Sequence, residues 1–76
     1  MKLIAVDSSM IQAVGYEAKT KTLEVVFNSG RTYLYSEVPR SVYKGLLEAD
    51  SKGSYMRDCI IDCYPYGESR QRRKYE

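Results

Sequence analysis

The segment LEVVFNSGRTYLY, residues 23–35, holds the pattern that decides the fold of this chain. On both sides of Asn28-Ser29-Gly30, apolar residues recur at every second position. Such a period of two is typical of strands with one buried face, and a short loop that contains Gly joins such strands into a hairpin. The segment therefore predicts two adjacent antiparallel strands.

Two registers are compatible with this hairpin, and they differ in where the tyrosines point. A two-residue Ser29-Gly30 loop would pair Val26 with Tyr33 and turn the tyrosines away from the Leu23, Val25 and Phe27 face. A three-residue loop would place Gly30 in the left-handed conformation of a G1 bulge and pair Val25 with Tyr33. We favour the three-residue loop because it gathers on one face, ready for a helix to cover, Val14, Tyr16, Leu23, Val25, Phe27, Tyr33 and Tyr35. The other face is then expected to be mixed and largely solvated; it holds Glu24, Val26, Thr32, Leu34 and Ser36.

Sequence on either side of the hairpin completes the predicted fold. Val14 and Tyr16 continue the period of two before a polar turn at residues 18–21, which adds a third strand. Val38-Pro39 favours a helix start, and apolar residues then follow at helical spacing: Val42, Tyr43, Leu46, Leu47 and Ala49. Gly45 within this helix predicts a close approach to the sheet. Ser54 is the expected N-cap of a second helix, whose buried face would hold Met56, Cys59, Ile60 and Cys63.

The prediction is thus an α+β fold, a three-stranded antiparallel β-meander followed by two short helices packed on one face. Residues 1–66 would form one domain, and residues 67–76 a basic flexible tail. A chain of 76 residues with 43% hydrophobic and 29% charged residues suits a single globular domain. Leu3–Val6 is too short for a signal-peptide core and no run is long enough to span a membrane, so we expect a cytoplasmic protein.

The residues available for chemistry argue against an enzyme. The chain has no histidine, the commonest general base. Asp58 and Asp62 lie four apart and are expected on the solvent face of a helix. Cys59 and Cys63 are too few for a structural zinc site, and we expect reduced thiols that pack as small apolar groups. The sequence therefore predicts no catalytic residue, no metal and no cofactor.

Tyrosines and the distribution of charge suggest what the domain binds. There are eight tyrosines, and residues 1–66 carry eight Lys and Arg against eight Asp and Glu. The whole net charge of +2 therefore lies in residues 67–76. One hypothesis is RNA binding, with tyrosines stacking on unpaired bases and cations contacting phosphate; its residues are Arg31, Tyr33, Tyr35, Arg40, Arg70, Arg72, Arg73 and Lys74. The alternative for Tyr33 and Tyr35 is packing between sheet and helix.

A second hypothesis is a protein-interaction or self-assembly module. Val26 and Leu34 are diagonal apolar neighbours on the outer sheet face, and a three-stranded sheet leaves edges that could pair with another chain. The two hypotheses differ in the expected partner, a nucleic acid or a protein.

Six short groups of residues follow one another in an ordered pattern along the chain: Val6 with Ser8-Ser9 and Ile11, Val14-Gly15-Tyr16, Leu23 with Val25 and Phe27, Gly30 with Tyr33-Leu34-Tyr35, Val38-Pro39 with Val42-Tyr43, and Ala49 with Ser51 and Gly53. In this pattern the chain resembles a known family, the KTSC domain. This family occurs at the C-terminus of some lysyl-tRNA synthetases and as free-standing bacterial and phage proteins. The resemblance suggests RNA binding as a hypothesis, chiefly because of the synthetase linkage, and implies no mechanism. Met56 is expected at a core position where the family commonly has Phe.

Overall fold

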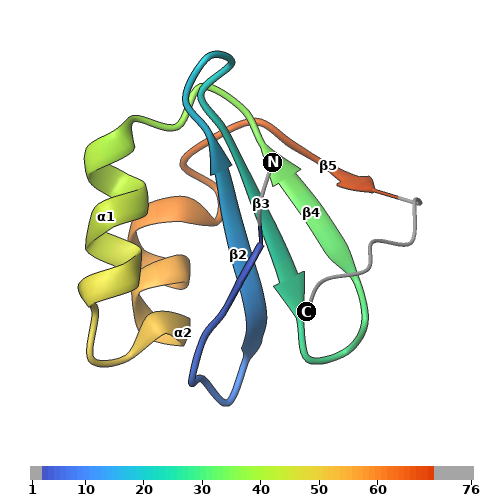
Figure 1. The fold of residues 1–76 in the computed structure, drawn as a ribbon, viewed down its shortest axis with the longest axis vertical. Helices are drawn as coiled ribbons and strands as arrows, with labels where there is room; N and C mark the ends of the chain where they lie inside the picture. Colours follow the sequence, from blue (N-terminus) through green and yellow to red (C-terminus); the bar gives the residue numbers. More distant parts are fainter. Residues whose placement is uncertain (1–2, 70–76) are drawn as a thin grey trace.

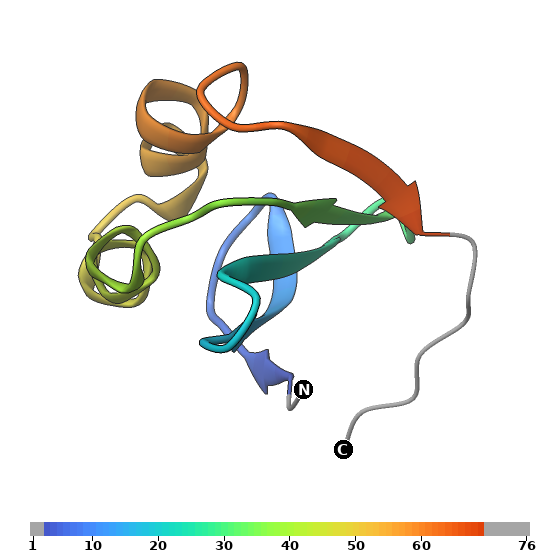
Figure 2. The ribbon, with the colours of Figure 1, turned by 90° about the horizontal axis from the view of Figure 1, so that it is seen from above.

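The computed structural model describes residues 3–69 as one antiparallel sheet with a helical layer on one face (Figures 1 and 2). Strands and helices follow in the order β1 (Ile4–Ala5), β2 (Ile11–Glu17), β3 (Thr22–Phe27), β4 (Thr32–Tyr35), α1 (Arg40–Glu48), α2 (Lys52–Tyr55), the π-helical turn η1 (Met56–Ile60) and β5 (Tyr66–Ser69). The five strands lie side by side in sequence order. The α+β class is confirmed, and the expected count of three strands is wrong.

The two missed strands, β1 and β5, form the edges of the sheet. β1 has only two residues, too few for alternation to be visible, and β5 reads Tyr-Gly-Glu-Ser with a single large apolar residue. Both are strands because a neighbour pairs with them, β2 in one case and β4 in the other. The boundary expected after Tyr66 therefore falls within β5, and residues 67–69 belong to the sheet.

The β3–β4 hairpin has the predicted three-residue loop. Val25 pairs with Tyr33 and Leu23 with Tyr35. The Phe27 N–H donates to the Arg31 carbonyl at 2.8 Å, and the Gly30 N–H donates to the Phe27 carbonyl at 2.9 Å. Gly30 has a φ of +96°, in the region that favours glycine.

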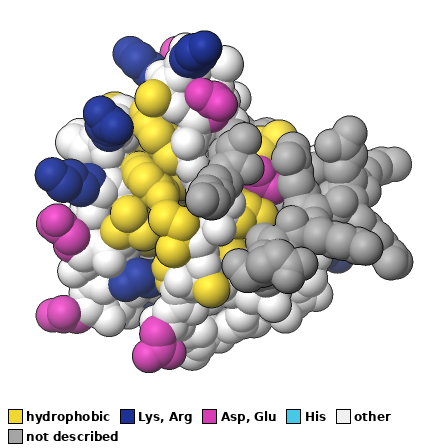
Figure 3. All heavy atoms as spheres, in the orientation of Figure 1, with side chains coloured by type: hydrophobic (Ala, Val, Ile, Leu, Met, Phe, Trp, Pro, Cys, Tyr) yellow, Lys and Arg dark blue, Asp and Glu magenta, His cyan; other side chains and the backbone are white. Residues whose placement is uncertain are grey.

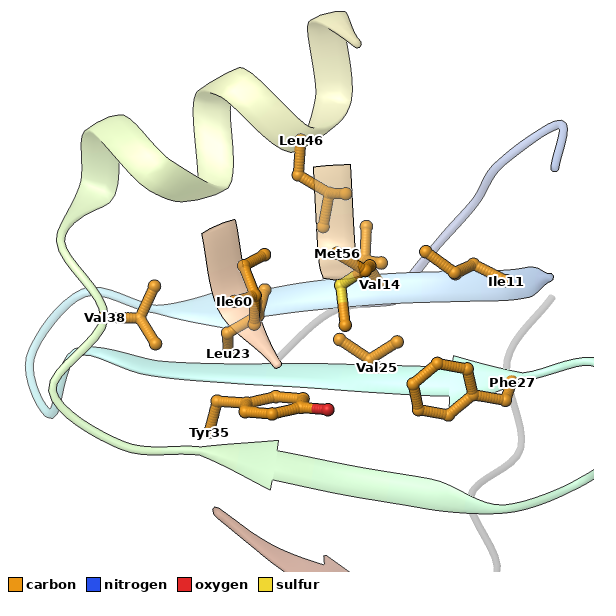
Figure 4. Packing of buried hydrophobic residues seen from close by; sticks show 10 residues of the cluster. All are labelled: Ile11, Val14, Leu23, Val25, Phe27, Tyr35, Val38, Leu46, Met56 and Ile60. Atoms are coloured by element: carbon orange, nitrogen blue, oxygen red, sulfur yellow. The ribbon is translucent and has the colours of Figure 1, made fainter. Parts of the chain in front are cut away.

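The helical layer closes the core over the face that the register predicts (Figure 4). Pro39 directly precedes α1 with φ −64° and ψ 150°, the extended conformation of a helix N-cap. Leu46 is fully buried, and Val42, Tyr43 and Leu47 pack partly buried around it. Its partners in the core are Ile11, Val14, Leu23, Val25, Phe27, Tyr35, Val38, Met56 and Ile60. The expected core position of Met56 is confirmed.

The second helical segment differs from the prediction in its start and its buried face. Ser51, not Ser54, is the N-cap, and its Oγ accepts from the Ser54 N–H. Five residues later the helix widens into η1, where the Ile61 N–H donates to the Met56 carbonyl at 2.7 Å.

This wider turn changes which side chains face the core. Met56 and Ile60 are buried, whereas Cys59 and Cys63 are exposed. The prediction of packed cysteines is wrong because it assumed α-helical spacing through residue 63.

Gly45 makes a close approach, but its neighbour is α2 rather than the sheet. A Cβ at this position would lie against the Tyr55 hydroxyl and 2.9 Å from the ring Cζ. The absent side chain therefore leaves room for Tyr55, which lies across α1.

The expectation of a largely solvated outer sheet face is also wrong. Glu24, Val26 and Thr32 are 0%, 6% and 8% exposed. Alternation correctly assigned these residues to the outer face, but alternation indicates the direction of a side chain and not what covers it. Among residues 3–69, no helix is long and apolar enough to cross a membrane.

Candidate functional site

A cavity of about 410 Å³ opens on the helix-facing side of the sheet, beside the β3–β4 hairpin. The hairpin contributes its loop and both strands, β5 forms one wall, and the β1–β2 connection and the segment after η1 complete the lining. The lining residues are Ser9, Met10, Phe27, Asn28, Ser29, Arg31, Tyr33, Tyr35, Ile61 and Tyr66. Cavities of about 300–1,000 Å³ with a mostly apolar lining and a few polar groups are the usual form of a ligand site.

Four aromatic rings form a continuous cluster in this cavity. Tyr33 is central: its ring centroid lies 5.5 Å from that of Phe27, 5.4 Å from that of Tyr66 and 6.5 Å from that of Tyr35. Tyr35 and Tyr66 face each other across β4 and β5 at 5.5 Å. Tyr66 is 56% exposed, so a large part of its side chain is accessible from solvent.

Arg31 stands at the rim, next to the exposed part of the cluster. A side-chain hydrogen bond to Tyr33, followed by the negative charge of Glu68, raises the pKa of the Arg31 guanidinium. Both groups lie on the β4–β5 side of the cavity, and the Arg31 side chain is exposed there.

Tyr35 lies at the floor of the cavity rather than at its surface. Its side chain is 2% exposed, and burial, with smaller contributions from Tyr66, Tyr33 and Asp62, raises the pKa of Tyr35 to about 12. Figure 4 shows its hydroxyl directed along the sheet toward Phe27. Tyr35 therefore packs as a neutral core residue, whereas Tyr33, half-buried, contacts both the core and the cavity.

Of the other predicted residues, only Arg40 lies in the described part of the chain, and it is away from this cluster. Arg40 lies with Tyr43, Lys44 and Leu47 around a separate surface hollow on α1. Arg70, Arg72, Arg73 and Lys74 lie outside the described residues. The structure thus brings together Arg31, Tyr33 and Tyr35 from the predicted set.

Sequence reasoning missed Tyr66, the most exposed ring of the site. The Tyr-Pro-Tyr-Gly sequence at residues 64–67 is typical of a helix end, and no local signal indicates that the chain then returns beside β4. Pairing of Tyr66 with Tyr35 brings it into the site. The sequence correctly places Phe27 on the helix-facing side of the sheet. That Phe27 lines a cavity could not be predicted, because this depends on which part of that face the helices leave uncovered.

Outside this cavity, two features of the described residues bear on a further site, namely the charge on one face and the grouping of metal ligands. On the face seen in Figure 3, Lys and Arg side chains are interspersed with Asp and Glu, and apolar side chains gather between α1 and β2. Within residues 3–69, no group of three or more His, Cys, Asp or Glu side chains could hold a metal ion.

Comparisons with known proteins agree on one family. The model of the KTSC domain family matches residues 7–64. An uncharacterised protein of Stutzerimonas stutzeri is 46% identical over 72% of this chain and 78% of its own length. The lysine–tRNA ligase of Nostoc punctiforme is 41% identical over 76% of this chain, which spans only 10% of that protein. A crystal structure of a KTSC domain protein from Yersinia pestis superposes with a TM-score of 0.88 at 28% identity, covering 90% of this chain and 96% of that one.

Proposed function

This chain belongs to the KTSC domain family, and from that premise we propose that it is a non-catalytic module that binds single-stranded RNA at the Tyr33–Tyr66 cavity. The observation that carries the proposal is the combination of an exposed aromatic face, Tyr66, with a solvated cation, Arg31, at one rim. Unpaired bases stack on such rings, and each stack contributes about 1–3 kcal/mol.

The relatives add a second line of support. Similar domains form about a tenth of several lysine–tRNA ligases, enzymes whose name gives a tRNA as substrate. A small appended domain with a base-sized aromatic site suits a role in holding an unpaired stretch of such a substrate. For this chain the proposal extends only to the binding step.

The test uses the full chain and a labelled single-stranded RNA at several salt concentrations. We expect Tyr66→Ala to weaken binding by about 5- to 150-fold, which corresponds to ~1–3 kcal/mol, without changing the log–log salt slope. Arg31→Gln should instead flatten that slope by about 0.7, the contribution of one phosphate contact on a single strand.

Arg40→Gln is the matched control, since it removes the same charge from the surface of α1, away from the cavity. Equal effects of Arg31→Gln and Arg40→Gln would place the contacts outside the cavity. If the intact chain binds no RNA at low salt, the proposal is wrong. The cations at positions 70–74 stay a prediction for additional phosphate contacts.

A second candidate, protein binding through a sheet edge, has one specific observation in its favour. Ile4 in the edge strand β1 is 49% exposed, and β1 pairs within the described chain only with β2. The hypothesis that a protein binds the outer face of the sheet loses support because Val26 on that face is buried. Sedimentation of the intact chain, with Ile4→Lys as the edge variant, distinguishes self-association from RNA binding.

A further inference from the structure

The two cysteines of the chain lie close together at the end of the helical layer, and both are exposed. Cys59 belongs to η1, and Cys63 lies four positions later, in the turn that follows. A thiol reacts when it is accessible and can ionise, whereas a thiol packed in a core is inert. The exposure of this pair therefore makes its chemistry part of the description of the surface.

The chain reverses its direction between the two cysteines. Ile61, the residue after η1, has an extended backbone with φ −64° and ψ 130°. Asp62 then has a φ of +68°, which is uncommon for a residue with a side chain. The Cys63 N–H donates to the Ile60 carbonyl at 3.0 Å, the hydrogen bond of a tight turn. This turn brings Cys63 back onto the end of η1.

The returning Cys63 thiol lies against the peptide group of Cys59. It is directed at the Asp58 carbonyl oxygen, which is 4.0 Å from the Cys63 Sγ. That carbonyl belongs to the planar peptide group whose nitrogen is the backbone nitrogen of Cys59. The Cys63 sulfur is thus beside the backbone that carries the Cys59 side chain. A local adjustment of this surface turn is enough to bring the two Cβ atoms to the ~3.5–4.5 Å that a disulfide requires.

We propose that Cys59 and Cys63 form a reversible intramolecular disulfide, with a low-molecular-weight disulfide as the oxidant. The thiolate of one cysteine attacks a sulfur of the oxidant, which gives a mixed disulfide and releases one thiol. The thiolate of the other cysteine attacks the protein sulfur of that mixed disulfide, which forms the Cys59–Cys63 bond and releases the second thiol. The two cysteines are oxidised, the oxidant is reduced to two thiols, and the two cysteine protons end on these thiols.

The proposed bond acts on the wall of the cavity beside the β3–β4 hairpin. It closes a ring of residues 59–63, and Ile61 within this ring lines the cavity. Tyr66, at the start of β5, follows Cys63 by three residues. Figure 2 shows the loop that leads from the helical layer to β5. A cross-link here narrows the conformations of this loop. Exposed disulfides are typically the labile, regulatory ones, so the cavity wall responds to the redox state of the pair.

Equilibration of the full chain with mixtures of reduced and oxidised glutathione tests the pairing. Acid quenching and mass spectrometry then count the free and bonded thiols. We expect a monomer that has lost two hydrogen atoms. Both cysteines fall within the tryptic peptide of residues 58–70, so a bond inside one chain and a bond between two chains give different peptide masses.

Arg57→Cys combined with Cys59→Ser is the matched control. This variant keeps two thiols at exposed positions but moves one of them to another side of the helical turn. Its ratio of internally bonded to reduced protein at the same glutathione ratio should be lower by about tenfold or more, because its thiols are not held together by the turn. Equal ratios in the two proteins would overturn the proposal. Glutathione adducts on both native cysteines, or bonds between chains in place of the internal bond, would also overturn it.

NMR spectra of the unmodified chain test the effect on the cavity without any substitution. We expect the methyl signals of Ile61 and the ring signals of Tyr66 to shift between the reduced and the oxidised forms. The methyl signals of Val42, in α1, serve as the internal control and should stay in place. Unchanged Ile61 and Tyr66 signals in a chain that carries the internal bond would show that the pair does not act on the cavity. This outcome is independent of whether the cavity binds RNA.

Discussion

Gly30 is the residue where local backbone conformation has the clearest consequence. Its φ of +96° closes the three-residue hairpin, and no atom of the described residues, apart from Gly30 and its two chain neighbours, lies within 4 Å of the place where a Cβ would stand. Gly30→Val should therefore lower the free energy of unfolding by about 1–3 kcal/mol through backbone strain alone. Thermal or urea unfolding of the two proteins measures the difference.

Gly67→Val is the matched control for this strain. Gly67 also has no atom within 4 Å of a built Cβ, but it lies in β5 without a positive φ. A β-branched residue suits a strand, so we expect little loss or a slight gain in stability. Equal losses at both positions would mean that φ is not the cause.

Single residues also mark the limit of sequence reasoning in this fold. The need for glycine at position 30 could be predicted because it follows from the type of turn, which four neighbouring residues determine. The direction of the Cys59 side chain could not be predicted, because it depends on whether the helix keeps 3.6 residues per turn through residue 60. The insertion of a π-helical turn, anchored by Met56 and Ile60, has no signature in the amino-acid order.

At the scale of elements, α1 and α2 meet at Gly45 and Tyr55. Alanine normally stabilises a helix interior relative to glycine by about 1 kcal/mol. Here Gly45→Ala should destabilise the domain by ~1 kcal/mol or more, because its methyl group would overlap the Tyr55 ring. In a Tyr55→Ala background, the same substitution should become stabilising. No change of sign between the two backgrounds, measured by urea unfolding, would exclude Tyr55 as the obstacle.

The turn η1 leads to a prediction about how fast the two cysteine thiols react. Cys59 and Cys63 are exposed, whereas their neighbours Met56 and Ile60 anchor the segment. Both thiols should therefore react with an alkylating reagent in native buffer at nearly the rate seen in denaturant. Mass spectrometry over a time course counts the modified thiols. Protection of either thiol by more than about tenfold would contradict the exposed positions.

For the whole molecule, the sequence predicted the central hairpin and the helix-covered face, since both follow from alternation and turn chemistry. The sequence predicted only some of the residues of the candidate site. Arg31 and Tyr33 come from the hairpin itself, but the cavity exists because β5 returns along β4 with Tyr66. Such a long-range pairing depends on how the whole chain folds. The four residues of β5 are only weakly apolar, so their sequence does not indicate the pairing.

The return of β5 makes the end of the chain structural up to Ser69, and two truncations test this. Deleting residues 67–76 removes the partners of Thr32, Tyr33 and Leu34 in the sheet. We expect it to cost about 1–3 kcal/mol more than deleting residues 70–76, since each backbone hydrogen bond contributes ~0.5–1.5 kcal/mol. A simple solvated tail would instead predict the same urea midpoint for both truncated proteins.

Comparing each truncation with the intact chain separates the effect of residues 70–76 from that of residues 67–69. Removing only residues 70–76 leaves β5 and its pairing with β4 intact. The additional loss on removing 67–69 measures strand pairing, and it should be accompanied by weaker RNA binding because Tyr66 loses its anchored position beside Tyr33. Retained RNA affinity in the shorter protein would place the stacking surface away from Tyr66.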